Sequence, residues 1–132
     1  MKTLIYSCFA ISGIMGAIDL TSFTKSAFAD PNHLRQVLQT RSCEGCDLER
    51  EKLSFANLRG ANLRNANLFS ADLKLSDLRE ANLIGAILDK ADLRGADLTG
   101  ADLTGAYISE TNFCDAIMPD GQKSSKGCPK AK

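Results

Sequence analysis

A five-residue repeat constrains this chain more than any other feature of its sequence. From Cys46 to Asp120 the chain divides without a gap into 15 units of five residues. The third place is Leu in 12 of these units, and Ile108, Phe113 and Met118 fill the other three. The first place is Ala in 11 units, and the second is Asp or Asn in 11. Any fold for this segment must therefore repeat its environment every five residues.

A period of five fits neither standard element. An α-helix repeats every 3.6 residues and a strand every two, so the leucines would point in all directions or alternate between faces. A chain that turns a corner after each unit instead keeps every third place inside. The small first place also points inward, and the second, fourth and fifth places point outward. Glycine at the fifth place suits such a corner because it tolerates positive φ.

Units such as ANLRG and ADLTG follow the motif A(D/N)LXX, and residues 46 to 120 resemble the pentapeptide-repeat family on this basis. The resemblance implies an all-β fold, a right-handed quadrilateral β-helix with four units per coil and just under four coils. Residues 20 apart would then stack on one face, as Asp72 on Asp92 and Asp77 on Asp97. A partial unit centred on Cys43 is expected ahead of the regular ones.

The N-terminus has the pattern of a secretory signal peptide. Lys2 precedes an apolar run from residue 4 to 18, and Ala27-Phe28-Ala29 offers small residues to a signal peptidase, which predicts residues 1–29 as the signal. The alternative is a retained anchor, but the run is short for a bilayer span. The mature chain, without a membrane segment, is expected in the periplasm, the thylakoid lumen or outside the cell. Its first and last segments resemble those of exported family members from photosynthetic bacteria.

The charge of the mature chain argues against nucleic-acid binding. The whole sequence has 16 basic and 16 acidic residues. Removing Lys2, Lys25 and Asp19 leaves 14 basic and 15 acidic residues, a net charge near −1. A general nucleic-acid binder needs a basic footprint, which this balance does not supply.

Both ends of the repeat region are expected to be capped. Asp30-Pro31 reads as a helix N-cap followed by proline at the first helical position, and apolar residues then recur at helical spacing. We therefore predict a cap helix within residues 30–42, a solenoid over 43–120 and a tail over 121–132. The tail is rich in turn-forming residues.

Four cysteines remain after removal of the signal, and an even number in an exported domain favours disulfides. We predict a Cys114–Cys128 disulfide, which would fold the tail back over the last coil. A Cys43–Cys46 bond is tight, and two small buried thiols are the alternative. Sequence alone does not choose among the three possible pairings. Zinc is not expected, because the first pair lies near the first coil and Cys114 near the last.

The sequence predicts no catalytic, cofactor or metal site. The Asp columns could be read as paired carboxylates, but their periodicity favours a local role in turns. The single histidine, His33, falls in the cap helix and is interpreted as a surface residue. No phosphate loop or nucleophile elbow is present in the sequence. We therefore expect a protein that is not an enzyme.

Departures from the repeat suggest a contact surface instead. Ile87 and Tyr107 replace Asp or Asn at outward second places of one face. Phe69 lies on the same face, and Ile84 lies on the neighbouring one. These four residues, named here the apolar strip, form a candidate interaction surface. The alternative is a scatter of exposed apolar residues, which is common. Phe55 and Leu75 are fifth-place exceptions that could cover corners.

Two functions remain to be compared. The first is a non-catalytic structural or protein-interaction module of the exported compartment, with a protein partner that the sequence does not name. The second, implied by some family members, is an inhibitor that mimics DNA and binds a topoisomerase. Residues 46–120 carry 13 acidic and 8 basic residues, a net charge of about −5. That acidity is weak, and the export signal separates the chain from a cytoplasmic target, so the first function is favoured.

Overall fold

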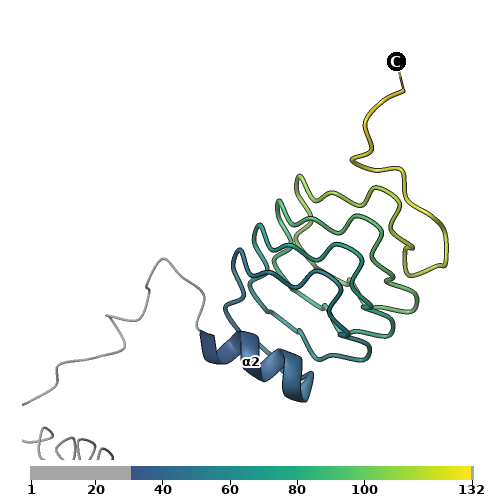
Figure 1. Ribbon diagram of the computed structural model, residues 1–132. Helices are drawn as coiled ribbons and strands as arrows, with labels where there is room; N and C mark the ends of the chain where they lie inside the picture. Colours follow the sequence, from purple (N-terminus) through teal and green to yellow (C-terminus); the bar gives the residue numbers. More distant parts are fainter. Residues whose placement is uncertain (1–30, 132) are drawn as a thin grey trace, which may run out of the picture.

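A computed structural model describes residues 31–131 as one helix followed by a four-sided solenoid and a short tail. The coils stack on one another, with the helix at one end and the tail at the other (Figure 1). The predicted signal peptide, residues 1–29, lies outside the described residues.

Each corner of the solenoid is a tight turn between two units. At every corner from Cys43 to Ala116 except that between Ile108 and Thr111, the first-place N–H of one unit donates to the third-place C=O of the unit before it, as Ala66 to Leu63 at 3.1 Å. The fifth place between them has positive φ, from 54° at Asn65 to 70° at Gly100. These features define a type II turn. Nine of the 15 fifth places from Gly45 to Asp115 hold a residue other than glycine, so the repeat forms this corner with many side chains.

Parallel bridges join second-place residues 20 apart, from Ser42 with Asn62 to Asp97 with Ile117. Four units therefore make one coil, which confirms the predicted stacking of Asp72 on Asp92. Each bridge is one residue pair long because the chain turns after every unit, so residues 31–131 contain no longer strand. The unit 41–45 pairs like the others, and the solenoid comprises four coils, 41–60, 61–80, 81–100 and 101–120.

The third-place side chains fill the centre of the solenoid. The 11 third-place leucines from Leu48 to Leu98 are at most 1% exposed, and Phe113 is fully buried. Two first places hold a hydroxyl instead of Ala, and both hydroxyls find a backbone acceptor: Ser76 donates to Leu73 at 2.7 Å and Thr111 to Leu88 at 2.8 Å. No buried side-chain polar atom among residues 31–131 lacks a partner, as expected for a well-satisfied core.

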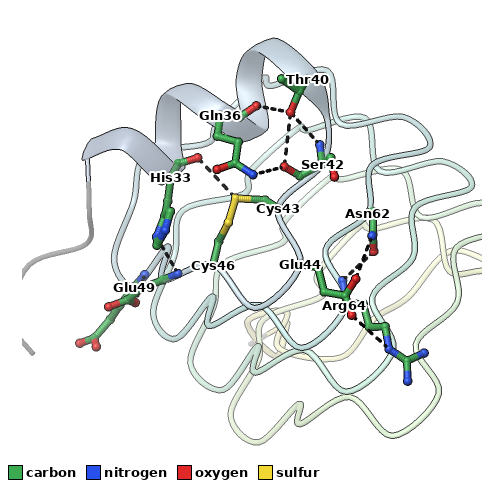
Figure 2. The surroundings of a disulfide bond; sticks show 11 residues. His33, Gln36, Thr40, Ser42, Cys43, Glu44, Cys46, Glu49, Asn62 and Arg64 are labelled. Carbon is green, nitrogen blue, oxygen red and sulfur yellow. Dashed lines mark hydrogen bonds and ion pairs between the residues drawn. A yellow bond between two sulfur atoms is a disulfide. The ribbon is translucent and has the colours of Figure 1, made fainter. Parts of the chain in front are cut away.

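Helix α2, Pro31–Thr40, covers the first coil with Val37 buried against the core. It also supplies polar groups that a preceding coil would otherwise provide. His33 Nδ1 accepts the N–H of Asp47 at 3.1 Å, and Gln36 Nε2 donates to Ser42 O at 2.7 Å (Figure 2). The interpretation of His33 as a surface residue was therefore wrong: it is half-buried and caps the open edge of the first coil.

The tail covers part of the last coil. The chain reverses at Gly121, and Lys123 pairs antiparallel with Ile117. The tail carbonyls then accept the N–H groups of the last coil: Phe113 donates to Lys126 at 3.0 Å and Asp115 to Ser124 at 2.9 Å. A disulfide joins Cys114 to Cys128, so the tail is tied to the coil at both of its ends.

Candidate interaction surfaces and polar columns

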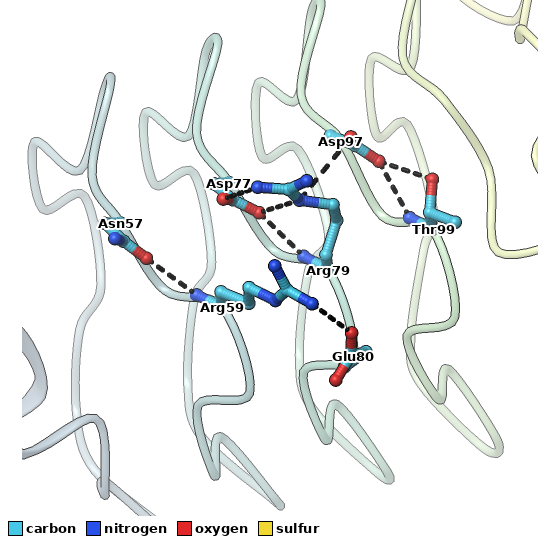
Figure 3. Close-up of polar contacts among 7 residues, drawn as sticks. All are labelled: Asn57, Arg59, Asp77, Arg79, Glu80, Asp97 and Thr99. Atoms are coloured by element: carbon cyan, nitrogen blue, oxygen red, sulfur yellow. Dashed lines mark hydrogen bonds and ion pairs between the residues drawn. The ribbon is translucent and has the colours of Figure 1, made fainter.

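The outward Asp and Asn residues bind their own backbone. In the second place of a unit, Oδ1 accepts the N–H of the residue two positions later. Examples are Asp77 with Arg79 N at 3.2 Å and Asp97 with Thr99 N at 3.0 Å (Figure 3). This geometry is the Asx turn, in which the side chain stabilises the start of a corner. The predicted turn role of the Asp and Asn columns is confirmed.

Basic side chains on the same faces pair with these carboxylates. Arg79 contacts Asp77 at 2.5 Å and reaches Asp97 on the next coil at 3.8 Å (Figure 3). Arg94 contacts Asp92 at 2.7 Å. The cations thus lie between stacked carboxylates and reduce their mutual repulsion.

The pairs lower the pKa of the carboxylates that they contact. A hydrogen bond from Arg79 lowers the pKa of Asp77 to about 2, although burial acts in the opposite direction. At Asp92, burial would raise the pKa, but the hydrogen bonds and charge of Arg94 outweigh it and the pKa is lowered. The hydroxyl of Thr104 lowers the pKa of Asp102. These carboxylates stay ionised at neutral pH and are therefore unsuited to donate a proton in catalysis.

We expect the Asp77–Arg79 pair to stabilise the fold above the unfolded-state pKa of 3.8 and to lose this effect as pH falls through about 2. Arg79→Gln should therefore lower the melting temperature at neutral pH, and the difference from the wild type should shrink as pH falls through about 2 and vanish below it. Asp77→Asn, which keeps the turn acceptor, should converge with the wild type in the same way. Melting curves across this pH range test the expectation, and a difference that does not depend on pH would contradict it.

The structure brings together only part of the apolar strip. Tyr107 pairs with Ile87 through a parallel bridge and is 61% exposed. Phe69 lies one coil below Ile87 and is half-buried, with Lys90 Nζ 5.7 Å from the centre of its ring. Ile84 and Ile87 are also half-buried, and Ile84 lies on the adjacent face. Tyr107 is therefore the one member of the strip that projects clearly into solvent.

A second apolar surface lies along a corner. Phe55 and Leu75 occupy the same fifth-place column and are 74% and 55% exposed. Leu75 lies across the backbone of Gly95, where a Cβ would come within 2.7 Å of Leu75 Cδ2. Both residues could be recognised in the sequence as exceptions to the repeat. Their large exposure arises because the fifth-place side chain at this corner points into solvent.

A shallow depression of about 360 Å³ continues from this corner. It is lined by Lys74, Leu75, Arg94, Gly95, Cys114 and Asp115. Its cations already contact Asp72 and Asp92, and its cysteine is in the disulfide with Cys128. Cys114, Asp115 and Cys128 lie close enough for three metal ligands, but the two sulfur atoms are bonded to each other. Asp115 pairs with Lys123 at 3.0 Å, so each charged group and the sulfur atom that line the depression already have a partner.

The second disulfide lies at the other end of the solenoid. Cys43 is joined to Cys46 beneath helix α2, and both are nearly fully buried (Figure 2). Cys43 is the third place of its unit and Cys46 the first place of the next, so both side chains point into the core. No helix among residues 31–131 has the length and apolar character needed to cross a bilayer.

Comparison with known proteins identifies the class to which this solenoid belongs. The sequence pattern described as "Pentapeptide repeats (8 copies)" matches residues 46–80 and 76–115, which together exceed half of the chain. The chain belongs to the pentapeptide repeat family. Members of this family form right-handed β-helices, in agreement with the four-sided coils described above.

Solved structures of the family are similar to this chain. HetL, a pentapeptide repeat protein involved in heterocyst differentiation regulation from Nostoc sp. strain PCC 7120, is 40% identical with a TM-score of 0.53, and the match covers 63% of this chain and 40% of HetL. A protein from the Arabidopsis thaliana thylakoid lumen is 32% identical with a TM-score of 0.23, over 60% of this chain and 62% of that one. This chain thus spans less than half of HetL. No curated protein matches it.

Proposed function

We propose that this protein is a non-catalytic protein-interaction module of an exported compartment, the periplasm, the thylakoid lumen or the outside of the cell. The observation that carries the proposal is the use of the outward polar residues. The Asp and Asn side chains bind backbone groups of their own corners, and the arginines and lysines beside them bind carboxylates. The remaining surface residues that depart from the repeat are apolar, and exposed apolar residues are suited to contact with another protein.

Export is supported by the pattern of residues 1–29 and by the pairing of the cysteines. An oxidising compartment allows both disulfides to persist, and we propose that the mature protein contains them. N-terminal sequencing of the protein isolated from that compartment should begin at Asp30. A mature chain that begins at Met1 would contradict export by this signal.

The apolar strip is the proposed contact surface, with Tyr107 as its most exposed member and Ile87 beside it. An aromatic side chain with a polar tip is common at protein interfaces. The DNA-mimic alternative is weaker, because Arg79 and Arg94 interrupt the acidic columns that would imitate phosphates.

The test compares two double variants in capture of partners from the exported fraction. Phe69→Asp with Tyr107→Asp disrupts the strip. The repeat accepts Asp at both places, because Asp89 stacks on Phe69 and Asp is common at the second place that Tyr107 occupies. Phe55→Asp with Leu75→Asp is the matched control, since Asp115 occupies the same column. We expect a partner that the wild type and the control retain and the strip variant loses. Equal capture by all three proteins would remove the strip from the proposal.

A further inference from the structure

The last coil has an open edge on two of its four sides. In the coil before it, Leu83 N–H donates to Asp102 O at 2.8 Å, Gly85 N–H donates to Thr104 O at 3.0 Å, and Ala81 O accepts from Asp102 N–H at 2.9 Å. The corresponding groups of residues 101–110 have no partner within residues 31–131. They are the N–H groups of Leu103, Gly105, Ile108 and Glu110 and the C=O groups of Ala101 and Ala106. An unpaired edge of this kind is a template for another strand.

The other two sides of the same coil are covered by the chain's own tail. Residues 122–126 lie over sides 111–115 and 116–120 through backbone hydrogen bonds and the antiparallel bridge of Lys123 with Ile117. The end of the solenoid is therefore a step, in which half of the coil is covered and half is open. A second copy cannot lie flush against this end, because the tail already occupies the layer above half of it.

The two halves of the step have opposite charge. The open half, residues 101–110, contains Asp102 and Glu110 and no Lys or Arg. The tail from residue 121 to 131 contains Lys123, Lys126 and Lys130 and no Asp or Glu. The open half also exposes apolar side chains: Tyr107 is 61% exposed, and Ile108, an inward third-place residue, is 37% exposed. An acidic, apolar, unpaired edge thus lies beside a basic strand on the same face of the molecule.

We propose that a second copy of this chain docks end to end on this step, so that the tail of each copy lies over the open half-coil of the other. The two copies are related by a two-fold axis perpendicular to the solenoid, and the same surfaces meet twice. Both tails then share one layer between the two solenoids. This arrangement buries the acidic half of each copy against the basic tail of its partner.

The strand directions fit this arrangement. A half-turn about that axis reverses the winding direction of the second copy as seen from the first. The tail runs antiparallel to its own last coil, so it runs parallel to the open half-coil of the other copy. That is the direction in which a further coil would run, since all coils pair in parallel. The tail can therefore continue the existing ladder.

The hydrogen-bonding groups also match. Lys123 pairs with Ile117 without using its own N–H or C=O, so both groups point away from its own coil and have no partner within the described chain. Placed over residues 101–105 of a second copy, Lys123 N–H would donate to Ala101 O and Lys123 O would accept from Leu103 N–H. The same pattern joins Asp102 to Ala81 and Leu83 of the coil below. It also sets Lys123, which pairs with Asp115 of its own coil at 3.0 Å, beside Asp102 of the other copy.

The oligomeric state of the purified protein tests the proposal. We expect a reversible dimer in sedimentation equilibrium, weakened by salt because it joins opposite charges. Carbodiimide cross-linking of mixed isotope-labelled and unlabelled protein should join Asp102 of one copy to Lys123 of the other. A protein that stays monomeric up to its solubility limit would overturn the proposal. So would a protein whose open half-coil pairs only with a strand of a different protein.

Two variants separate docking from folding. Leu103→Pro removes an N–H that the single chain does not use and a side chain that is only partly buried, whereas Leu83→Pro removes an N–H bonded to Asp102 and a fully buried side chain. Glu110→Lys reverses a charge at a corner whose column already holds Lys90 at nearly the same φ. We expect Leu103→Pro and Glu110→Lys to raise the dimer dissociation constant by about tenfold or more with little change in circular dichroism. Leu83→Pro should unfold the coil. An unchanged dissociation constant in both docking variants would overturn the proposal.

Discussion

Leu83→Ala is expected to lower the free energy of unfolding by about 2–5 kcal/mol. Leu83 is fully buried in the third coil, with leucines of the column on either side. Removing its side chain loses the burial of the aliphatic group and leaves a cavity that the stacked coils cannot close, because their spacing is set by backbone hydrogen bonds. Chemical denaturation followed by circular dichroism gives the free energy directly.

Leu75→Ala is the matched control for the same chemical change. Leu75 occupies a fifth place and is 55% exposed, so its truncation should change the free energy of unfolding by about 0.5 kcal/mol or less. The difference in the free energy of unfolding between the two variants therefore shows whether the third place points inward and the fifth place outward. Equal effects at both positions would contradict the assignment of the third place to the core.

Removal of the Cys114–Cys128 disulfide is the second change with a large expected effect. The bond closes a loop over a separation of 14 residues, for which the chain-entropy account gives about 3 kcal/mol. Cys114→Ala with Cys128→Ala should lower stability by about this amount. It should also release the tail, so that the amides of Phe113 and Asp115, which donate to tail carbonyls, lose their protection from hydrogen exchange.

Lys123→Ala controls for a change in the tail that leaves the disulfide intact. It removes an exposed ion pair with Asp115 at 3.0 Å, a contact that contributes about 0–1 kcal/mol. Hydrogen exchange at Phe113 and Asp115 should be unchanged in this variant. If the double cysteine variant keeps both its stability and these protected amides, the tail is held by contacts other than the disulfide.

The core and the stacked faces could be predicted from the sequence because each unit repeats the same local rule. Leu48 and Leu98 occupy equivalent places in different coils, so a pattern read at one of them applies to the other. The bridge of Asp72 with Asp92 follows from the count of four units per coil, which came from the family resemblance. Corners were predicted less completely, since residues such as Ser70 adopt the same positive φ as glycine.

The ends could not be predicted in the same way, because each cap occurs once. His33 accepts a hydrogen bond from Asp47 only because no coil precedes that side, and nothing in the helix sequence marks this role. The antiparallel pairing of Lys123 with Ile117 depends on a single reversal at Gly121. The apolar strip was predicted from places in the repeat on two neighbouring faces, but these places do not give the burial of Phe69, which is half-buried with Lys90 Nζ 5.7 Å from the centre of its ring.

The central claim is that the chain turns a corner after every fifth residue and returns to the same face after 20 residues. Nuclear Overhauser contacts between backbone protons test it most directly. The account predicts contacts between second-place neighbours on adjacent coils, including Asp72 with Asp92 and Ile87 with Tyr107. Contacts between residues three and four apart throughout residues 46–120, as in a continuous α-helix, would contradict it.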